Sequence, residues 1–189
     1  NLPIAIHLDH GDTLKLADTC LNDGFTSVMI DGSHQPYEEN VKLTAEVVKV
    51  AHPAGVVVEA ELGMLGGIEE HVVGLQAEEY EKNIGKFLTD PNQATDFWKR
   101  TGVDSLAIAI GTSHGAYKFK REAKLATDRI EQIMKTCPGL PLVMHGSSSV
   151  PREFIDLINK YFFFKQKTAY EIGVRLVGSG RAGWRATRS

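Results

Sequence analysis

The amino-acid sequence predicts an α/β protein built on a parallel sheet, and three observations support that fold class. Short apolar runs bounded by turn residues recur along residues 1–161, as expected of parallel strands covered on both faces. A helical stripe separates each run from the next, which is the order of βα units. The composition, with 42% hydrophobic and 24% charged residues, is that of a globular chain with enough apolar surface for one core.

Five strands and five helices are expected. The strands cover residues 4–9, 27–31, 56–62, 105–111 and 140–146. Helical stripes run over 14–21 and 41–51, and others begin at Asp90-Pro91, at a Thr127 cap and at Ser149 with Pro151. On the residues alone, this order fits a doubly wound sheet or a (β/α)₈ barrel. Residues 63–89 break the rhythm with a long connection, typical of a functional lid or an insertion.

Composition and charge narrow the setting of the protein. No apolar run approaches the ~18–20 residues of a membrane span, and no signal peptide is recognisable, so we expect no membrane partner. The first residue is Asn1 rather than Met, which suggests a truncated start. Cys20 and Cys137 belong to no CxxC pair, and buried thiols of this kind indicate the cytoplasm. The net charge of −3, without a basic stripe in residues 1–161, argues against a nucleic-acid partner.

The charge changes sign near the C-terminus. Residues 162–189 hold six basic side chains against one acidic side chain, whereas residues 1–161 hold 15 basic and 23 acidic ones. The step coincides with Phe162-Phe163-Phe164, so we expect a boundary after residue 161. Residues 162–172 resemble a translated sequencing adapter, and residues 162–189 are therefore expected to be an artefact, with a lineage-specific tail as the alternative.

Three of the seven histidines lie at or just beyond the carboxyl ends of expected strands, each directly before a glycine. They are His10, His114 and His145. Because the carboxyl ends of parallel strands meet at one rim of a barrel, we expect these imidazoles to converge there. Converging neutral imidazoles can form a catalytic zinc site with an open position for substrate, and the glycines allow close approach.

Carboxylates are expected at the same rim. Asp9, Asp31 and Glu61 could orient the histidines or form an alternative metal position. Glu59 stays open between this role and that of a satisfied carboxylate in the barrel interior. Asp12 is expected to start the following helix. The remaining histidines receive no functional role; they are His7, His34, His52 and His71.

Two turns rich in small residues follow expected strands and are suited to phosphate. Residues 111–115 and 146–149 expose backbone N–H groups of the kind that form anion-binding nests. Lys118 could add a positive charge. Each turn alone is a weak indication, because Gly/Ser turns usually only reverse the chain, but both lie beside the expected metal rim.

Five stretches follow one another along residues 1–161: HLDHGD (7–12), MIDGSH (29–34), VEAELG (58–63), AIGTSHGAYK (109–118) and LVMHGSSS (142–149). In this order they are highly specific, and the chain resembles the class II, zinc-dependent fructose-bisphosphate and tagatose-bisphosphate aldolases. The resemblance implies a lyase that reversibly cleaves a ketose 1,6-bisphosphate to dihydroxyacetone phosphate and glyceraldehyde 3-phosphate. Fructose 1,6-bisphosphate, the glycolytic substrate, is preferred over the tagatose epimer.

The resemblance also implies residue roles. His10, His114 and His145 match the Zn²⁺ ligands, and Asp9 matches the catalytic aspartate that handles the proton of the C4 hydroxyl. Glu69 matches a loop glutamate that exchanges the proton of the ene-diolate.

Further positions match the surroundings of that site. Asp31 and Glu61 match carboxylates at a second position that zinc can occupy when substrate is absent. Parts of the phosphate site, which often holds a monovalent cation (Na⁺ or K⁺), match Gly111, Gly115, Lys118, Gly146, Ser147 and Ser148.

The match to the family is partial. Its members are full (β/α)₈ TIM barrels, whereas about five βα units, equivalent to the third to seventh, are expected here. The first two units and the last one have no counterpart in this chain, so the substrate contacts that they supply in the family are missing. The resemblance thus implies a whole protein that is a homodimer or homotetramer, and a fragment that is itself inactive.

Two other classes of protein remain as alternatives. Metal-dependent hydrolases usually carry H-x-H on an early strand, but two residues lie between His7 and His10. An inert fragment would bind metal or nothing. Turnover of a bisphosphate separates the first alternative from an aldolase, and zinc stoichiometry with a folding measurement separates the second.

Overall fold

A computed structural model gives the structure of the chain and describes residues 4–64, 66–67, 84–114, 125–146, 154 and 184–185. The strands are β1 (Ile4–Ala5), β2 (His7–Gly11), β3 (Ser27–Ile30), β4 (Val57–Leu62), β5 (Gly66–Gly67), β6 (Ser105–Ile108), β7 (Ser113–His114), β8 (Leu142–Val143) and β9 (Trp184–Arg185). The helices are α1 (Leu14–Asn22), α2 (Tyr37–Ala51), the 3₁₀ turn η1 (His52–Ala54), α4 (Pro91–Thr101) and α5 (Thr127–Thr136).

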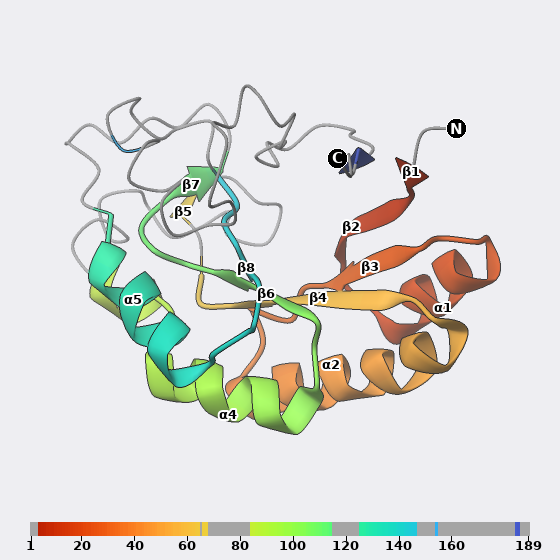
Figure 1. Cartoon of the computed structure of the whole chain (residues 1–189), viewed down its shortest axis with the longest axis horizontal. Coiled ribbons are helices and arrows are strands. Elements are labelled where there is room, and N and C mark those ends of the chain that lie inside the picture. The colour runs from red at the N-terminus through yellow and green to blue at the C-terminus, as the bar shows by residue number, and fades with distance from the viewer. Residues whose placement is uncertain are drawn as a thin grey trace.

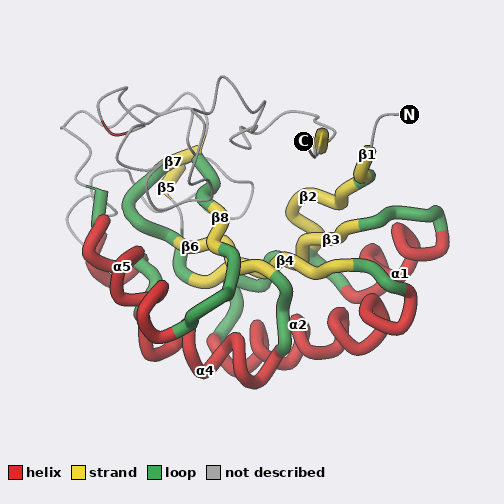
Figure 2. The backbone as a smooth tube through the Cα atoms, viewed as in Figure 1, coloured by secondary structure: helices red, strands yellow, loops and turns green. Residues whose placement is uncertain are grey.

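The main sheet has five parallel strands in the order β2-β3-β4-β6-β8. Helices α1, α2, α4 and α5 connect successive strands and lie on the same face of the sheet (Figures 1 and 2). A doubly wound sheet reverses its strand order and carries helices on both faces, whereas a barrel wall does neither. The predicted α/β class is confirmed, and the described sheet is part of a (β/α)₈ barrel wall.

Two short sheets accompany the main one. Strand β5 pairs in parallel with β7, so that Gly67 lies opposite His114. Strand β1 pairs antiparallel with β9, bringing Ala5 opposite Trp184. None of the helices in the described part of the chain combines the length and the apolar character that a membrane span requires.

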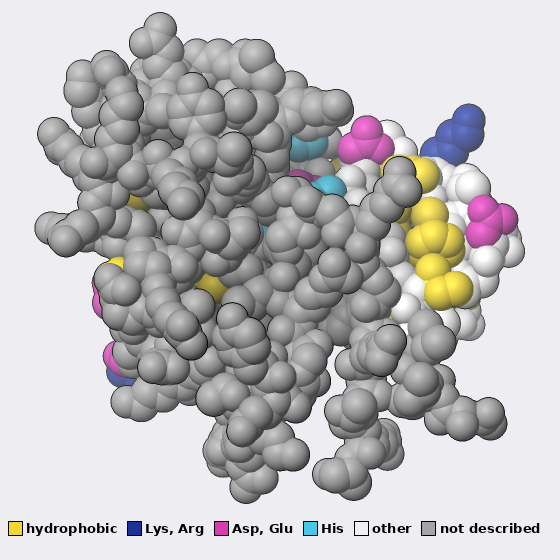
Figure 3. All heavy atoms as spheres, turned by 90° about the horizontal axis from the view of Figure 1, so that it is seen from above, with side chains coloured by type: hydrophobic (Ala, Val, Ile, Leu, Met, Phe, Trp, Pro, Cys, Tyr) yellow, Lys and Arg dark blue, Asp and Glu magenta, His cyan; other side chains and the backbone are white. Residues whose placement is uncertain are grey.

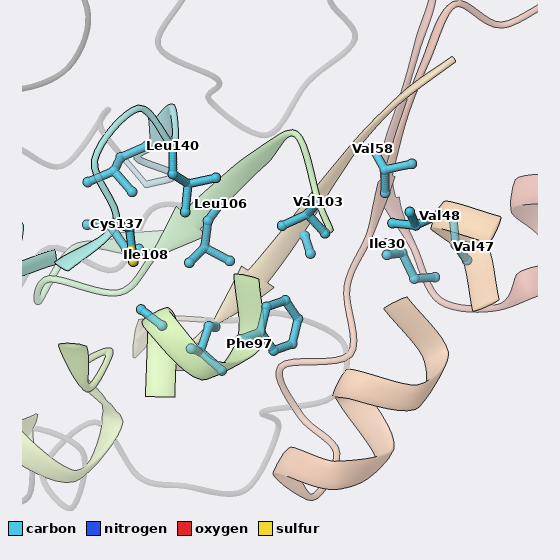
Figure 4. Close-up of a cluster of buried hydrophobic side chains, with 14 of the residues drawn as sticks. Ile30, Val47, Val48, Val58, Phe97, Val103, Leu106, Ile108, Cys137 and Leu140 are labelled. Carbon is cyan, nitrogen blue, oxygen red and sulfur yellow. The ribbon is translucent and has the colours of Figure 1, made fainter. Parts of the chain in front are cut away.

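The hydrophobic core lies between the sheet and its helices (Figure 4). Alternate strand residues enter it, among them Val28 and Val58, which are paired in register. The intervening residues point to the opposite face, because side chains alternate along a strand. Met29 and Glu59 are such a pair, and Glu61 lies opposite Ala107 on β6. This opposite face is the interior of the barrel.

The helix starts agree with the sequence in part. Asp90 caps α4, accepting from the backbone N–H groups of Asn92 (2.8 Å) and Gln93 (3.0 Å), as predicted. Helix α1 is capped by Thr13, so Asp12 lies just before the cap rather than in it. Thr127 is the first residue of α5 and Ala126 its N-cap, without a side-chain hydrogen bond; the predicted Thr127 cap is wrong.

The strand bounds are corrected at three places, the first being that β6 ends at Ile108 rather than at residue 111. The expected strand 4–9 is split at Ile6 into β1 and β2. The expected strand 140–146 contains only β8, because beyond Val143 the backbone leaves the ladder. The carbonyl of His145 instead accepts from the Thr112 hydroxyl at 2.8 Å. The helix expected after Ser149 lies outside the described residues, apart from Phe154, which is helical and packs against the core.

Candidate metal centre

The carboxyl ends of four of the five parallel strands bring histidines and carboxylates to one place. Asp9 and His10 lie near the end of β2, Asp31 directly follows β3, and Glu61 lies in β4. His145 follows β8 by two residues. In Figure 3, which views the molecule from the side opposite the helices, histidine and acidic side chains gather next to one another. Among the residues that the structure describes, Asp9, His10, Asp31, Glu61 and His145 therefore lie at one rim.

A β-bulge in β2 sets the direction of His10. The register with β3 shifts between Leu8 and Gly11, and His10 has a positive φ of 50°. A bulge with a left-handed non-glycine residue stores about 1–3 kcal/mol of strain and typically re-aims a side chain near a functional site. The bulge ends at Gly11, and this position favours glycine because a Cβ there would lie 2.9 Å from the Met29 carbonyl oxygen.

Three carboxylates surround the His10 imidazole. Its Nδ1 lies 2.9 Å from Asp31 Oδ2 and 3.8 Å from Glu61 Oε2, while its Nε2 lies 3.8 Å from Asp9 Oδ1. Burial alone would raise the pKa of Asp31, but hydrogen bonds from His10 and Ser33 outweigh it and hold that pKa at about 2. Asp31 is therefore an anion at neutral pH, available to orient His10 or to bind a cation.

The second imidazole, His145, is almost fully buried. Its Nε2 lies 2.9 Å from Glu59 Oε1, with 1% of His145 and 4% of Glu59 exposed. The ring centroids of His145 and His10 are 4.8 Å apart at an interplanar angle of 60°. The Thr112 hydroxyl fixes the His145 backbone from the neighbouring segment. His145 is thus held at both its backbone and its ring.

Two overlapping groups have a geometry that could hold a cation. Ligand atoms of Asp9, His10 and His145 all lie within 4.8 Å of one another, and so do those of His10, Asp31 and Glu61. Imidazole nitrogens combined with a carboxylate oxygen are a donor set that Zn²⁺ accepts, with bonds of ~2.0–2.2 Å. The residues therefore fit such an ion, which would draw the ligand atoms closer together.

The other predicted site residues are described only in part. Gly111 and Gly146 have positive φ angles of 97° and 70°, a backbone that favours glycine. The backbone of His114 lies in β7, beside β5, and nothing is described of its side chain. The remaining predicted positions lie outside the described residues: Glu69, Gly115, Lys118, Ser147 and Ser148.

Two histidines without a predicted role, His7 and His52, pair with side chains outside the candidate metal centre. His7 Nδ1 is 2.8 Å from Ser27 Oγ, and burial lowers the pKa of His7 against the opposing charge of Glu59. His52 Nε2 is 3.0 Å from Asp104 Oδ2, at the opposite ends of the strands. Both arrangements are those of structural histidines.

Sequence reasoning missed two buried polar residues that support the rim. The amide of Asn40 donates to the Glu61 carbonyl oxygen at 2.9 Å, and its own oxygen accepts from Thr44. The Thr89 hydroxyl links the last residue of β4 to the residue after β6, donating to the Leu62 carbonyl and accepting from the Ala109 N–H. A signal existed for Asn40, because it and Thr44 interrupt the apolar stripe of α2 one turn apart.

Comparison with known proteins now identifies the family. The sequence model of the class II fructose-bisphosphate aldolases matches residues 1–177. This chain belongs to that family. It is 56% identical over 163 residues to the fructose-bisphosphate aldolase of Giardia intestinalis, covering 85% of this chain and 47% of that protein. It is 49% identical to the class 2 fructose-bisphosphate aldolase of Synechocystis sp., covering 85% of this chain and 48% of that one.

A solved structure of an aldolase agrees. The YdjI aldolase from Escherichia coli K12 superposes with a TM-score of 0.69 at 33% identity, over 86% of this chain and 52% of that one. The chain spans about half the length of the curated relatives it matches. The aldolase resemblance and the partial barrel expected from the sequence are confirmed.

Proposed function

We propose that the whole protein reversibly cleaves fructose 1,6-bisphosphate to dihydroxyacetone phosphate and glyceraldehyde 3-phosphate at a Zn²⁺ bound by His10, His114 and His145. The observation that carries this proposal is the pair of imidazoles of His10 and His145, 4.8 Å apart and grouped with Asp9 at the carboxyl ends of parallel strands. The relatives named fructose-bisphosphate aldolase support the choice of substrate.

The metal would supply Lewis acidity at the carbonyl end of the substrate, where cleavage of the C3–C4 bond leaves a carbanion. Asp9 takes the proton of the C4 hydroxyl in the cleavage direction. Its side chain is 41% exposed, against 12% for Asp31 and 2% for Glu61, so Asp9 is the carboxylate that substrate can reach. Glu69 exchanges the proton at the carbon that becomes the ene-diolate.

The inner carboxylates and the glycine turns complete the proposed site. Asp31 and Glu61 hold the imidazole of His10 and offer a second position for the cation when substrate is absent. The positive-φ backbones of Gly111 and Gly146 suit close approach to phosphate. The other proposed phosphate contacts, beside a Na⁺ or K⁺ ion, are Gly115, Lys118, Ser147 and Ser148.

A chelator and borohydride together test the metal-dependent cleavage. We expect the whole protein to lose bisphosphate cleavage in a chelator, to regain it with Zn²⁺, and to survive borohydride in the presence of substrate, since no lysine imine forms. Activity that persists in the chelator, or inactivation by borohydride with a trapped lysine adduct, would contradict the proposal. Assaying fructose and tagatose 1,6-bisphosphate side by side decides between the C4 epimers.

We expect the 189 residues, expressed alone, to have no aldolase activity. They span about half of the relatives' length, and in the described sheet β2 and β8 each have one neighbour. Open sheet edges leave backbone groups unpaired, and apolar surface left in water costs ~25 cal/mol per Å². A loss of several kcal/mol of folding free energy is comparable with a domain stability of ~5–15 kcal/mol. The unfolding transition and the turnover of the 189 residues are compared with those of the whole protein. Cooperative unfolding with turnover equal to that of the whole protein would show this prediction to be wrong.

The proposed setting of the whole protein follows from the same family. A small sugar bisphosphate is the proposed partner, and a homodimer or homotetramer in the cytoplasm is the proposed state. Cys20 and Cys137 are both buried thiols, which agrees with a reducing compartment.

A further inference from the structure

The two imidazoles of the candidate metal centre are each bound to a carboxylate, but through different ring nitrogens. His10 uses Nδ1, which lies 2.9 Å from Asp31. His145 uses Nε2, which lies 2.9 Å from Glu59. An imidazole that donates one N–H to a carboxylate keeps its other nitrogen as the lone-pair donor for a metal. The two histidines would therefore present Nε2 and Nδ1, respectively, to an ion.

Glu59 is buried at the position where it contacts His145. It lies on β4 between Met29 of β3 and Ser105 of β6, on the face of the sheet opposite the helices, and is 4% exposed. A buried carboxylate needs a hydrogen-bond donor, because its desolvation otherwise costs several kcal/mol. Among the described residues, the donor that contacts it is the equally buried ring of His145.

We propose that Glu59 is a positioning residue of the metal centre, which accepts the Nε2 proton of His145 and thereby fixes the ring orientation and tautomer in which Nδ1 binds the ion. The proposal rests on the proposed function in taking His145 as a ligand of Zn²⁺. In this role Glu59 acts through His145 rather than on substrate or metal, and the carboxylate adds to the basicity of the imidazole it holds. Without this role, the Glu59 side chain would only fill the barrel interior.

The first test reads the tautomer directly and needs no variant. In the whole protein, freed of metal and labelled with ¹⁵N, the long-range ¹H–¹⁵N correlations of His145 are expected to show a protonated Nε2 and an unprotonated Nδ1. A His145 ring protonated on Nδ1 would overturn the proposal. Because this measurement requires neither metal nor turnover, it tests whether His145 donates its Nε2 proton to Glu59 even if the protein fails to cleave the bisphosphate.

The second test measures the metal. Co²⁺ binding, followed by its visible absorption, is compared in the whole protein and in Glu59→Gln, which keeps the shape of the side chain and removes its charge. We expect Co²⁺ affinity to fall about 10–100-fold, with altered absorption bands, while the unfolding transition of the metal-free protein stays close to that of the original. Glu46→Gln, at an exposed position on α2, is the matched control and should change neither quantity.

The opposite pattern identifies a structural role. If Glu59→Gln lowers the stability of the metal-free protein but leaves Co²⁺ affinity and absorption unchanged, Glu59 only fills the barrel interior and the proposal is wrong. Should Glu59→Gln fail to fold, Glu59→Asp replaces it. The shorter side chain keeps the charge but withdraws it from Nε2, and unchanged Co²⁺ binding in that variant would likewise overturn the proposal.

Discussion

Replacing His10 or His145 by alanine in the whole protein is expected to remove the bound metal and to lower kcat/KM by roughly 10³-fold. A Lewis-acidic ion contributes several kcal/mol of transition-state stabilisation, and about 4 kcal/mol corresponds to that factor. The reason lies in the geometry: the two rings are 4.8 Å apart and belong to one group with Asp9, so the loss of either ring removes a ligand atom from that group. Metal content by elemental analysis and the rate of bisphosphate cleavage are measured together.

His52→Ala is the matched control for this substitution. His52 also pairs with a carboxylate, at 3.0 Å from Asp104, but it lies before β4, at the opposite end of the sheet from the candidate centre. The His52→Ala variant is expected to keep its metal and its activity. Its free energy of unfolding should change by less than ~1 kcal/mol, as for the loss of an exposed ion pair. Undiminished metal in both His10→Ala and His145→Ala would remove the basis for the metal centre.

The fold was predictable from the sequence because its signals are local. The apolar runs with intervening helical stripes define βα units, and strand parity places Glu59 and Glu61 on one face, with Ala60 on the other. The choice between a barrel and a doubly wound sheet was not predictable in this way. It depends on which strand lies beside which, and residues such as Val28 and Val58 would serve either order equally well.

The candidate site shows the same division between local and long-range information. Histidine–glycine pairs after strands predicted that His10 and His145 converge. The bulge that aims His10 could not be predicted, since it exists only as a register shift against β3. Glu59 stayed undecided because a buried acid gains its meaning from its partner, and His145 is 86 positions away in the chain.

Gly63 is where we expect the largest loss of stability from a single methyl group. It follows β4 with a φ of +93°, and a Cβ there would lie 2.8 Å from both Ala109 Cβ and Thr89 Oγ1 and 2.9 Å from the Phe87 carbonyl oxygen. These neighbours cannot easily yield. The Met64 N–H donates to the Phe87 carbonyl oxygen at 2.8 Å, and the Thr89 hydroxyl is hydrogen-bonded to Leu62 of β4 and to Ala109, directly after β6.

Gly63→Ala in the whole protein is therefore expected to cost about 2–5 kcal/mol, from ~1–2 kcal/mol of left-handed backbone strain and ~1–3 kcal/mol of overpacking. At ~2–4 °C per kcal/mol for a domain of this size, Tm should fall by roughly 10 °C. Gly24→Ala separates the two causes, because Gly24 has a similar φ of +84° but no atom within 4 Å of the added Cβ. It should show the backbone cost alone. Equal losses in the two variants would mean that the residues around Gly63 give way without cost, and that the end of β4, which carries Glu61, is not held as tightly as its hydrogen bonds imply.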